Sequence, residues 1–149
     1  MKITPENGSI TLPDGRIITA HTSPDDWIAL FPQSRPHHPQ AGAVSFGVSF
    51  AGQAERYAVT AWFEQQRLAR LSLFFCPTGE DTGWEAWSEA RELQRRKQFD
   101  RWLDRQLGDT PCTIHTSAAG RCRRFAWGEA GAYYHKQDGG TAIVVRYRR

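Results

Sequence analysis

Arginines and aromatic residues alternate in the last third of the chain, and this spacing could bind an anionic partner. The run has basic positions at Arg121, Arg123 and Arg124 and aromatic positions at Phe125, Trp127, Tyr133 and Tyr134. Guanidinium groups pair with carboxylates or phosphates, and aromatic rings anchor protein interfaces or stack on bases. Residues 121–149 hold seven Lys or Arg against two acidic residues, a local net charge of +5 in a chain of +3. This region is therefore a candidate for recognising an acidic protein surface or a nucleic-acid backbone.

Signatures of a nucleophilic enzyme or of a nucleotide-binding loop are missing from the sequence. It lacks both the G-x-S-x-G elbow of serine hydrolases and the glycine-rich loops that cradle phosphates. Cys76, Cys112 and Cys122 are an odd set without a C-x-x-C pair, and none lies in a thiol-enzyme signature. We interpret them as free thiols of a protein from a reducing compartment.

Metal binding and acid–base catalysis also lack a supporting motif in the sequence. His37 and His38 are adjacent in a proline-rich segment, and adjacent ligands rarely converge on one metal without a third. The carboxylate pairs are Asp25 with Asp26, Glu80 with Asp81, and Asp100 with Asp104. The first pair fits the acidic start of a helix, and the last fits a solvated helix edge. We expect no metal, no cofactor and no catalytic residue, so function should depend on binding and the chain should not be an enzyme.

The first third of the sequence predicts a hairpin and a short helix. A Pro-Asp-Gly turn divides two β-prone runs within residues 9–22, as is typical of a hairpin. Ser23 is followed by Pro24 and two aspartates, the order of a helix N-cap, and Pro32 ends the helix. Residues 33–42 carry no periodicity and are expected to form a loop.

The remainder predicts a meander, a long helix and a second hairpin. Apolar and polar residues alternate over 44–50, 57–63 and 71–75, which indicates three consecutive antiparallel strands. Good helix formers dominate 85–107, although their apolar stripe changes phase and predicts a bend or break near 94–97. An Asp-Gly turn before residues 141–147 indicates a hairpin. We therefore predict one α+β domain over residues 1–149, mainly an antiparallel sheet with one short and one long helix.

Nothing in the sequence predicts export or membrane insertion. The N-terminal residues lack the apolar stretch of a secretion signal. Nowhere do roughly 18 apolar residues run together, as a membrane-spanning helix requires. We expect a cytoplasmic protein without a membrane partner.

Structural features of residues 85–147 suggest a family. They are Phe99-Asp100-Arg101-Trp102-Leu103, Leu107-Gly108, Phe125-Ala126-Trp127-Gly128, Tyr133-Tyr134 and the strand from Asp138 to Tyr147. In these features the chain resembles small bacterial immunity proteins of the kind encoded beside polymorphic toxins. The resemblance implies a compact cytoplasmic antitoxin that binds a cognate toxin domain and blocks its active site or its assembly. Such an inhibitor needs a rigid patch with a few anchors and no catalytic motif.

The candidate partner-binding residues are polar, charged or aromatic side chains set beside aromatic ones. They are Trp84, Arg95, Arg121, Arg123, Arg124, Tyr134 and His135. The competing interpretation of each aromatic residue is packing in the core. The basic charge predicts an acidic contact surface on the toxin, which argues against a basic nuclease as the target. The alternative function is a nucleic-acid-binding accessory domain that uses the basic C-terminal third.

Overall fold

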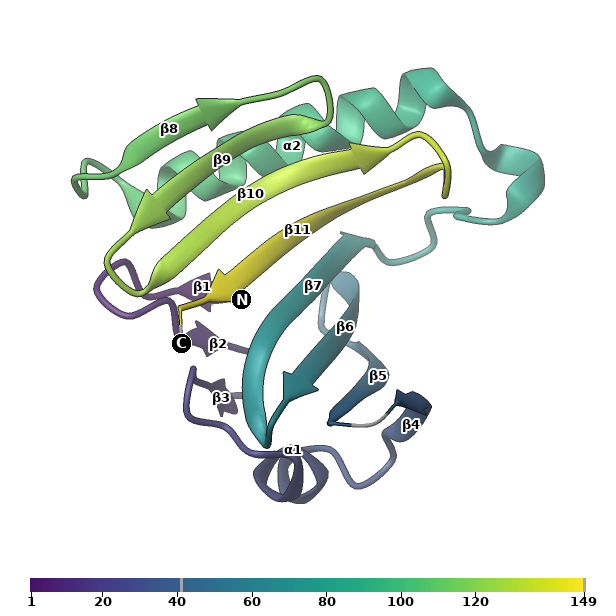
Figure 1. Cartoon of the computed structure of the whole chain (residues 1–149). Coiled ribbons are helices and arrows are strands. Elements are labelled where there is room, and N and C mark those ends of the chain that lie inside the picture. Colours follow the sequence, from purple (N-terminus) through teal and green to yellow (C-terminus); the bar gives the residue numbers. More distant parts are fainter. Residues whose placement is uncertain (41, 149) are drawn as a thin grey trace.

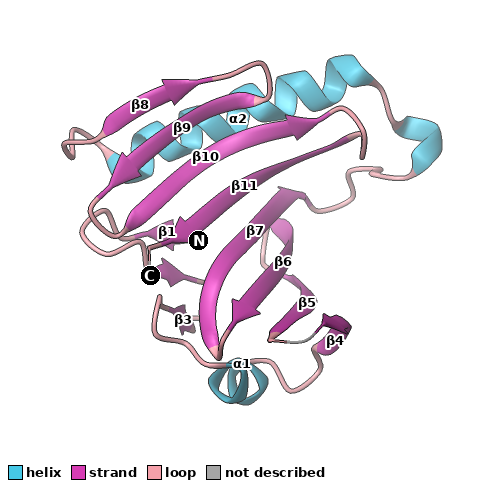
Figure 2. Cartoon of the chain, viewed as in Figure 1, coloured by secondary structure: helices cyan, strands magenta, loops and turns pink. Residues whose placement is uncertain are grey.

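A computed structural model describes residues 1–40 and 42–148 of the chain (Figure 1). The helices are α1 (Pro24–Leu30), α2 (Glu89–Leu107) and the short 3-10 helix η1 (Trp84–Ala86). The strands are β1 (Lys2–Ile3), β2 (Ile10–Thr11), β3 (Ile17–Ile18), β4 (Arg35–Gln40), β5 (Ala43–Ala51), β6 (Glu55–Glu64), β7 (Arg67–Pro77), β8 (Thr113–Thr116), β9 (Gly120–Phe125), β10 (Gly128–His135) and β11 (Gly140–Tyr147). Figure 2 shows that strands dominate the fold.

Most strands belong to one antiparallel sheet, whose eight strands have the order β4-β5-β6-β7-β11-β10-β9-β8. The β5–β6–β7 meander joins the β10–β11 hairpin where β7 pairs with β11, so that Leu71 lies opposite Val145 and Leu73 opposite Ile143. β1, β2 and β3 form a separate three-stranded sheet. The α+β class is as the sequence predicts. The main sheet is larger than predicted, because the separate strand groups merge into one.

Capping residues explain where α1 and α2 begin and end. The Ser23 hydroxyl accepts a hydrogen bond from the Asp26 N–H, and the Asp26 carboxylate accepts one from the Ser23 N–H. Likewise, the Ser88 hydroxyl accepts a hydrogen bond from the Arg91 N–H at the start of α2, and Gly108 ends that helix with φ of 54°. No helix in the described ranges is long and apolar enough to cross a membrane.

The segment that was expected to be a loop contains an edge strand. Residues 35–40 form β4 and pair with β5, with Arg35 opposite Gly47 and His37 opposite Ser45. Residue 41, which the loop prediction also covered, lies outside the described residues. Pro36 and Pro39 lack an N–H donor, and an edge strand tolerates them because one of its sides needs no ladder hydrogen bonds. The loop prediction was therefore wrong for most of this segment.

The predicted break in the long helix is also wrong, since α2 is continuous, and two strands were missed. α2 continues through residues 94–97, because Arg95, Phe99, Leu103 and Leu107 form one buried stripe at i,i+4 spacing. An arginine completes this stripe at the position where the sequence lacks an apolar residue. β8 and β9 were not predicted, since β9 carries three arginines and lacks the apolar alternation of a strand.

The hydrophobic core lies between one face of the eight-stranded sheet and the elements packed on that face. α2 packs on β10 and β11, while Trp27 of α1 contacts Phe63 of β6 with ring centroids 6.1 Å apart. Ile10 and Ile18 of the small sheet belong to the same core. We call this side of the large sheet the covered face and the opposite side the open face. In Figure 1, α2 lies behind β8–β11, so the reader looks onto the open face of these strands.

Candidate binding surface

One row of side chains crosses the open face from β6 to β9. Trp62 pairs with Arg70, Arg70 with Arg146, Arg146 with Glu129, and Glu129 with Arg124. Residues that pair directly across antiparallel strands point to the same face, so these five side chains project side by side. We call them the arginine row. Three guanidinium groups and one carboxylate give the row a formal charge of +2.

Arg70 is the arginine of the row that pairs with no carboxylate of the described residues. Its guanidinium carbon lies 3.8 Å from the ring centroid of Trp62, which is a cation–π contact. Burial lowers the pKa of Arg70, and the like charge of Arg146 lowers it further. Within the described ranges Arg70 forms no ion pair. The open face therefore holds a partly buried positive charge that an anionic group of a partner would stabilise.

The other two arginines of the row share a single carboxylate. Glu129 accepts hydrogen bonds from Arg146 Nη1 at 2.7 Å and from Arg124 Nε at 3.0 Å. Burial by itself would raise the pKa of Glu129, but these hydrogen bonds outweigh it and lower that pKa. Arg124 also lies beside His115 of β8, with 3.1 Å between Nη1 and Nε2. The carboxylate orients both arginines and leaves the row with excess positive charge.

A second row, next to the arginine row, consists of small side chains. Successive register pairs connect Gly47, Thr60, Ser72, Val144, Gly131 and Cys122. Tyr133 lies two residues from Gly131 on β10, beside the Cys122 thiol of β9. Burial, followed by this thiol, raises the pKa of Tyr133 to about 12. Most of this row is low beside the arginines, but the Tyr133 ring covers Gly131, where an added Cβ would lie 2.8 Å from the Tyr133 hydroxyl, and His37 lies over Gly47.

Two of the predicted contact residues, Arg121 and Arg123, point to the covered face. Arg123 Nη2 lies 3.0 Å from an Asp100 oxygen and 2.7 Å from an Asp104 oxygen, and only 3% of its side chain is exposed. Arg121 binds the same two carboxylates at 3.0 and 2.7 Å. Burial would raise the pKa of Asp104, but Arg123 and Arg121 lower it. These arginines connect β9 to α2, whereas Arg124, the residue after Arg123, lies on the open face.

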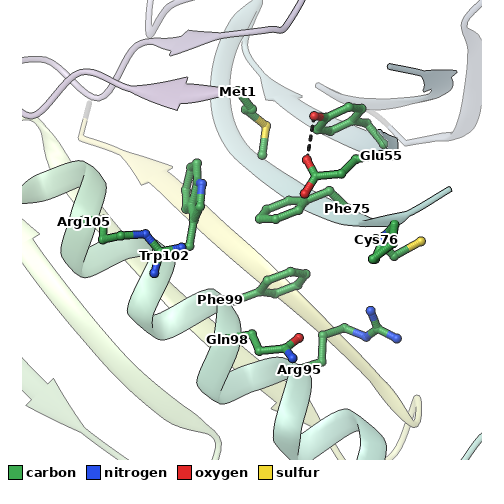
Figure 3. Close-up of a pocket in the computed structure, with 11 residues that line it drawn as sticks. Met1, Glu55, Phe75, Cys76, Arg95, Gln98, Phe99, Trp102 and Arg105 are labelled. Carbon is green, nitrogen blue, oxygen red and sulfur yellow. Dashed lines mark hydrogen bonds between the residues drawn. The ribbon is translucent and has the colours of Figure 1, made fainter. Parts of the chain in front are cut away.

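Arg95, another predicted contact residue, is buried beside a cavity. Its guanidinium pairs with Glu80 from the loop that follows β7. The cavity has a volume of about 280 Å³ and lies where β7, no longer paired with β11, diverges toward α2. Figure 3 shows the rings of Phe75, Phe99 and Trp102 around it, with Arg95 at one side.

Two ionisable side chains of this cavity, Glu55 and Tyr57, are hydrogen-bonded to each other. The Glu55 carboxylate accepts a hydrogen bond of 2.8 Å from the Tyr57 hydroxyl, drawn as a dashed line in Figure 3. Burial, and after it Glu55, raises the pKa of Tyr57 to about 12. Arg95 and Arg105 approach from α2 and form no ion pair with Glu55. The described residues also contain no group of three or more His, Cys, Asp or Glu that could hold a metal ion.

The remaining predicted residues lie near one another at the N-terminal end of α2. Trp84 of η1 is 79% exposed, and its ring lies 5.6 Å from that of Trp87. Tyr134 and His135, at the end of β10, line a hollow between α2 and the β10–β11 turn. Trp87 connects the η1 segment to the β10–β11 turn, because its Nε1 donates a hydrogen bond to the Gly139 carbonyl in that turn.

Most of the arginine row was not identified from the sequence. Trp62 lies out of phase with the apolar residues of its strand, so its large ring must point away from the core. An aromatic residue that points away from the core indicates a binding surface, and the apolar alternation of the strand already predicts this outward position for Trp62. Arg70 and Arg146 carry no such signal, because only the pairing of β7 with β11 brings them together. Comparisons with family models, curated proteins and solved structures found no match for the chain.

Proposed function

We propose that the chain is a cytoplasmic immunity protein that binds a cognate bacterial toxin domain and inhibits it by direct protein–protein contact. In this proposal the open face is the contact surface, and the toxin presents acidic side chains to it. The observation that carries the proposal is the arginine row, in which Arg70 stacks on Trp62 at 3.8 Å and has no carboxylate partner among residues 1–40 and 42–148. No catalytic step by this chain is involved.

The chemistry of the arginine row favours a protein carboxylate as its ligand. Arg70 and Arg146 lie directly opposite each other, and like charges at such positions repel. An Asp or Glu of the partner would relieve this repulsion and could accept two parallel hydrogen bonds from a guanidinium group. Stacking on Trp62 restricts the Arg70 side chain in advance, so less conformational entropy is lost on binding. An arginine and a tryptophan in contact are also the residue types that dominate interface energies.

The alternative of nucleic-acid binding has less support from the same region. Arg121 and Arg123, two of the three clustered arginines that suggested it, are neutralised by Asp100 and Asp104. The alternative can be tested by titrating a single-stranded RNA at low salt and then raising the salt. A phosphate-binding surface would lose affinity steeply as salt rises. Such a result, with no toxin bound, would replace the proposed function by the alternative.

The proposal can be tested by co-expression with the products of the reading frames adjacent to this gene. One of them should arrest growth when expressed alone, and this chain should restore growth and co-purify with it. Arg70→Glu should weaken the complex at least about 100-fold, because it places a negative charge against the acidic surface of the toxin. Arg101→Glu is the matched control, since Arg101 is exposed on α2.

Two outcomes would contradict the proposal. One is the absence of rescue and of complex formation with every adjacent product. The other is a complex that Arg70→Glu and Arg101→Glu weaken equally, because the open face would then have no special role. Thermal unfolding of both variants should match that of the parent chain, which separates a loss of binding from a loss of folding.

A further inference from the structure

The exposed tryptophans at the N-terminal end of α2 form a second surface, whose residues differ in type from those of the arginine row. We call Trp84 and Trp87, together with the hollow beside them, the tryptophan edge. Trp84 is the most exposed of the large apolar residues, at 79%, and Trp87 is 38% exposed. Their rings are tilted by 36° with centroids 5.6 Å apart. Large exposed aromatic surface of this kind marks a place where a partner binds.

Specific contacts hold the tryptophan edge in place. The Trp87 Nε1 donates a hydrogen bond of 2.5 Å to the Gly139 carbonyl, and the ring packs on Gly139, which has φ of 65°. Any side chain at that glycine would lie 3.3 Å from Trp87 Nε1. On the other side, Arg91 donates hydrogen bonds to the Ala86 and Asp81 carbonyls and pairs with Glu80. The edge is thus preorganised, which lowers the entropic cost of binding.

The charge around the tryptophan edge is negative, although the whole chain is positive. Residues 80–92 contain five Asp or Glu and one Arg, a net charge of −4 in a chain of +3, and Arg95 of α2 pairs with two of these carboxylates, Glu80 and Glu92. Asp81, Glu85, Glu89 and Asp138 are exposed and form no ion pair within the described ranges. Glu89 and Asp138 line the hollow, which has a volume of about 510 Å³, together with one exposed cation, Lys136, so that these four carboxylates and the lysine sum to −3. The edge therefore attracts a cation and repels an acidic surface.

We infer that the tryptophan edge binds an arginine or lysine side chain on a basic segment of a partner protein. The indole ring is the aromatic group that attracts cations most strongly, and the nearby carboxylates add to this attraction. The hollow between α2 and the β10–β11 turn would receive the residues that flank the cation. This inference does not depend on the proposed inhibitory function. It concerns a surface whose charge is opposite to that of the arginine row.

The inference can be tested with the full chain and two short peptides. The probes are acetyl-Gly-Arg-Gly-Arg-Gly-amide and its glutamate counterpart, acetyl-Gly-Glu-Gly-Glu-Gly-amide. Titration followed by the indole N–H signals in nitrogen-15 NMR should shift the signals of Trp84 and Trp87 with the arginine peptide only. We expect a dissociation constant on the order of 1 mM, as suits a single cation–π contact with few other interactions.

Variants distinguish the tryptophan edge from general charge attraction. Trp84→Ala should weaken binding of the arginine peptide about fivefold, a loss typical of one cation–π contact. Trp62→Ala, which removes an indole from the open face instead, should leave that binding unchanged. Because Trp84 is almost fully exposed, its removal should not change the thermal unfolding midpoint, and circular dichroism would verify the fold.

Three results would overturn the inference. The first is equal binding of both peptides, and the second is equal loss in Trp84→Ala and Trp62→Ala. The third is concentration-dependent dimerisation in sedimentation experiments that Trp84→Ala abolishes, since the edge would then bind a second copy of the chain. None of these results bears on whether an adjacent toxin is inhibited, so this inference and the proposed function can fail separately.

Discussion

The two faces of the large sheet use arginine in opposite ways. On the covered face, Arg123 lies between Asp100 and Asp104 of α2 and is 3% exposed. On the open face, Arg70 lies over Trp62 and has no carboxylate within the described ranges. The enclosed arginines of the covered face are compensated by carboxylates of α2, whereas on the open face Glu129 compensates Arg124 and Arg146 but not Arg70. The same residue type is thus structural on the covered face, and on the open face it provides the contact surface of the function that we propose.

Two adjacent arginines of β9 lie on opposite faces of the sheet. Arg123 binds α2, and the next residue, Arg124, binds Glu129 on the open face. Successive side chains of a strand point to opposite faces, so a shift of one residue would exchange their roles. Partner recognition therefore cannot be assigned to an arginine from its neighbours in sequence.

The largest effect should come from removing the carboxylates that hold the covered arginines. Asp100→Asn combined with Asp104→Asn leaves Arg123 enclosed without a negative partner and should lower the free energy of unfolding by about 3 kcal/mol. Urea unfolding followed by circular dichroism would measure it. Glu129→Gln on the open face should cost less than about 1 kcal/mol, since its partners are well exposed. Equal losses of unfolding free energy for the two variants would contradict the different roles of the two faces.

Replacing one arginine on each face by methionine should give a second difference in stability between the two faces. Arg123→Met should lower the free energy of unfolding by about 1.5 kcal/mol, because it removes charged hydrogen bonds to α2. Arg70→Met should change it by less than about 0.5 kcal/mol, because burial and Arg146 already disfavour the Arg70 charge. The same denaturation assay applies to both. A greater loss for Arg70→Met would mean that Arg70 has a structural role.

Acid should weaken the covered-face contacts in a defined pH range. The pKa of Asp104 in the folded chain is below its ordinary value of 3.8, so its ion pairs stabilise the fold above that pH. This contribution disappears as the pH falls below about 3.8 toward the lowered pKa. The difference in unfolding midpoint between the parent chain and Asp104→Asn should therefore be present at pH 7 and shrink in this range. A difference that is constant with pH would contradict the assignment.

The smallest effect concerns the reactivity of the cysteines. Cys112 is exposed, whereas Cys76 and Cys122 are buried, so a disulfide reagent should label one thiol quickly and two slowly. Burial raises the pKa of Cys122, which further slows its reaction because the thiolate is the nucleophile. Tyr133→Ala should accelerate labelling of Cys122 by uncovering it on the open face. Asp104→Asn should not, and acceleration by Asp104→Asn instead would place Cys122 on the wrong face.

The parts of the fold that were predicted from the sequence depend on local interactions. The Ser23 cap, the alternation over β5 to β7 and the Asp-Gly turn before β11 each involve residues close in the chain. β4 was missed because its prolines suggested a loop, although an edge strand accepts them. β9 was missed because two of its covered positions are arginines, which mimic the pattern of a charged loop.

The candidate site was predicted less completely than the fold. Arg124 lies on the open face, and Trp84 lies at the tryptophan edge beside the hollow lined by Tyr134 and His135. Arg95, Arg121 and Arg123 lie in ion pairs with α2 or with the loop before it. Trp62 and Arg70 were not identified, since their proximity depends on a bulged pairing between β6 and β7.

The periodicity, the caps and the turns, and with them the α+β class, depend on residues within a few positions of one another, so they could be predicted from the sequence. Which arginines of the described residues are paired with a carboxylate depends on long-range contacts and could not be predicted. Arg123 and Asp104 are 19 residues apart, and Arg70 and Arg146 meet across strands from different parts of the chain. The pairing of β7 with β11 and the packing of α2 on one face bring these charges together, so their roles follow from contacts that no local pattern encodes.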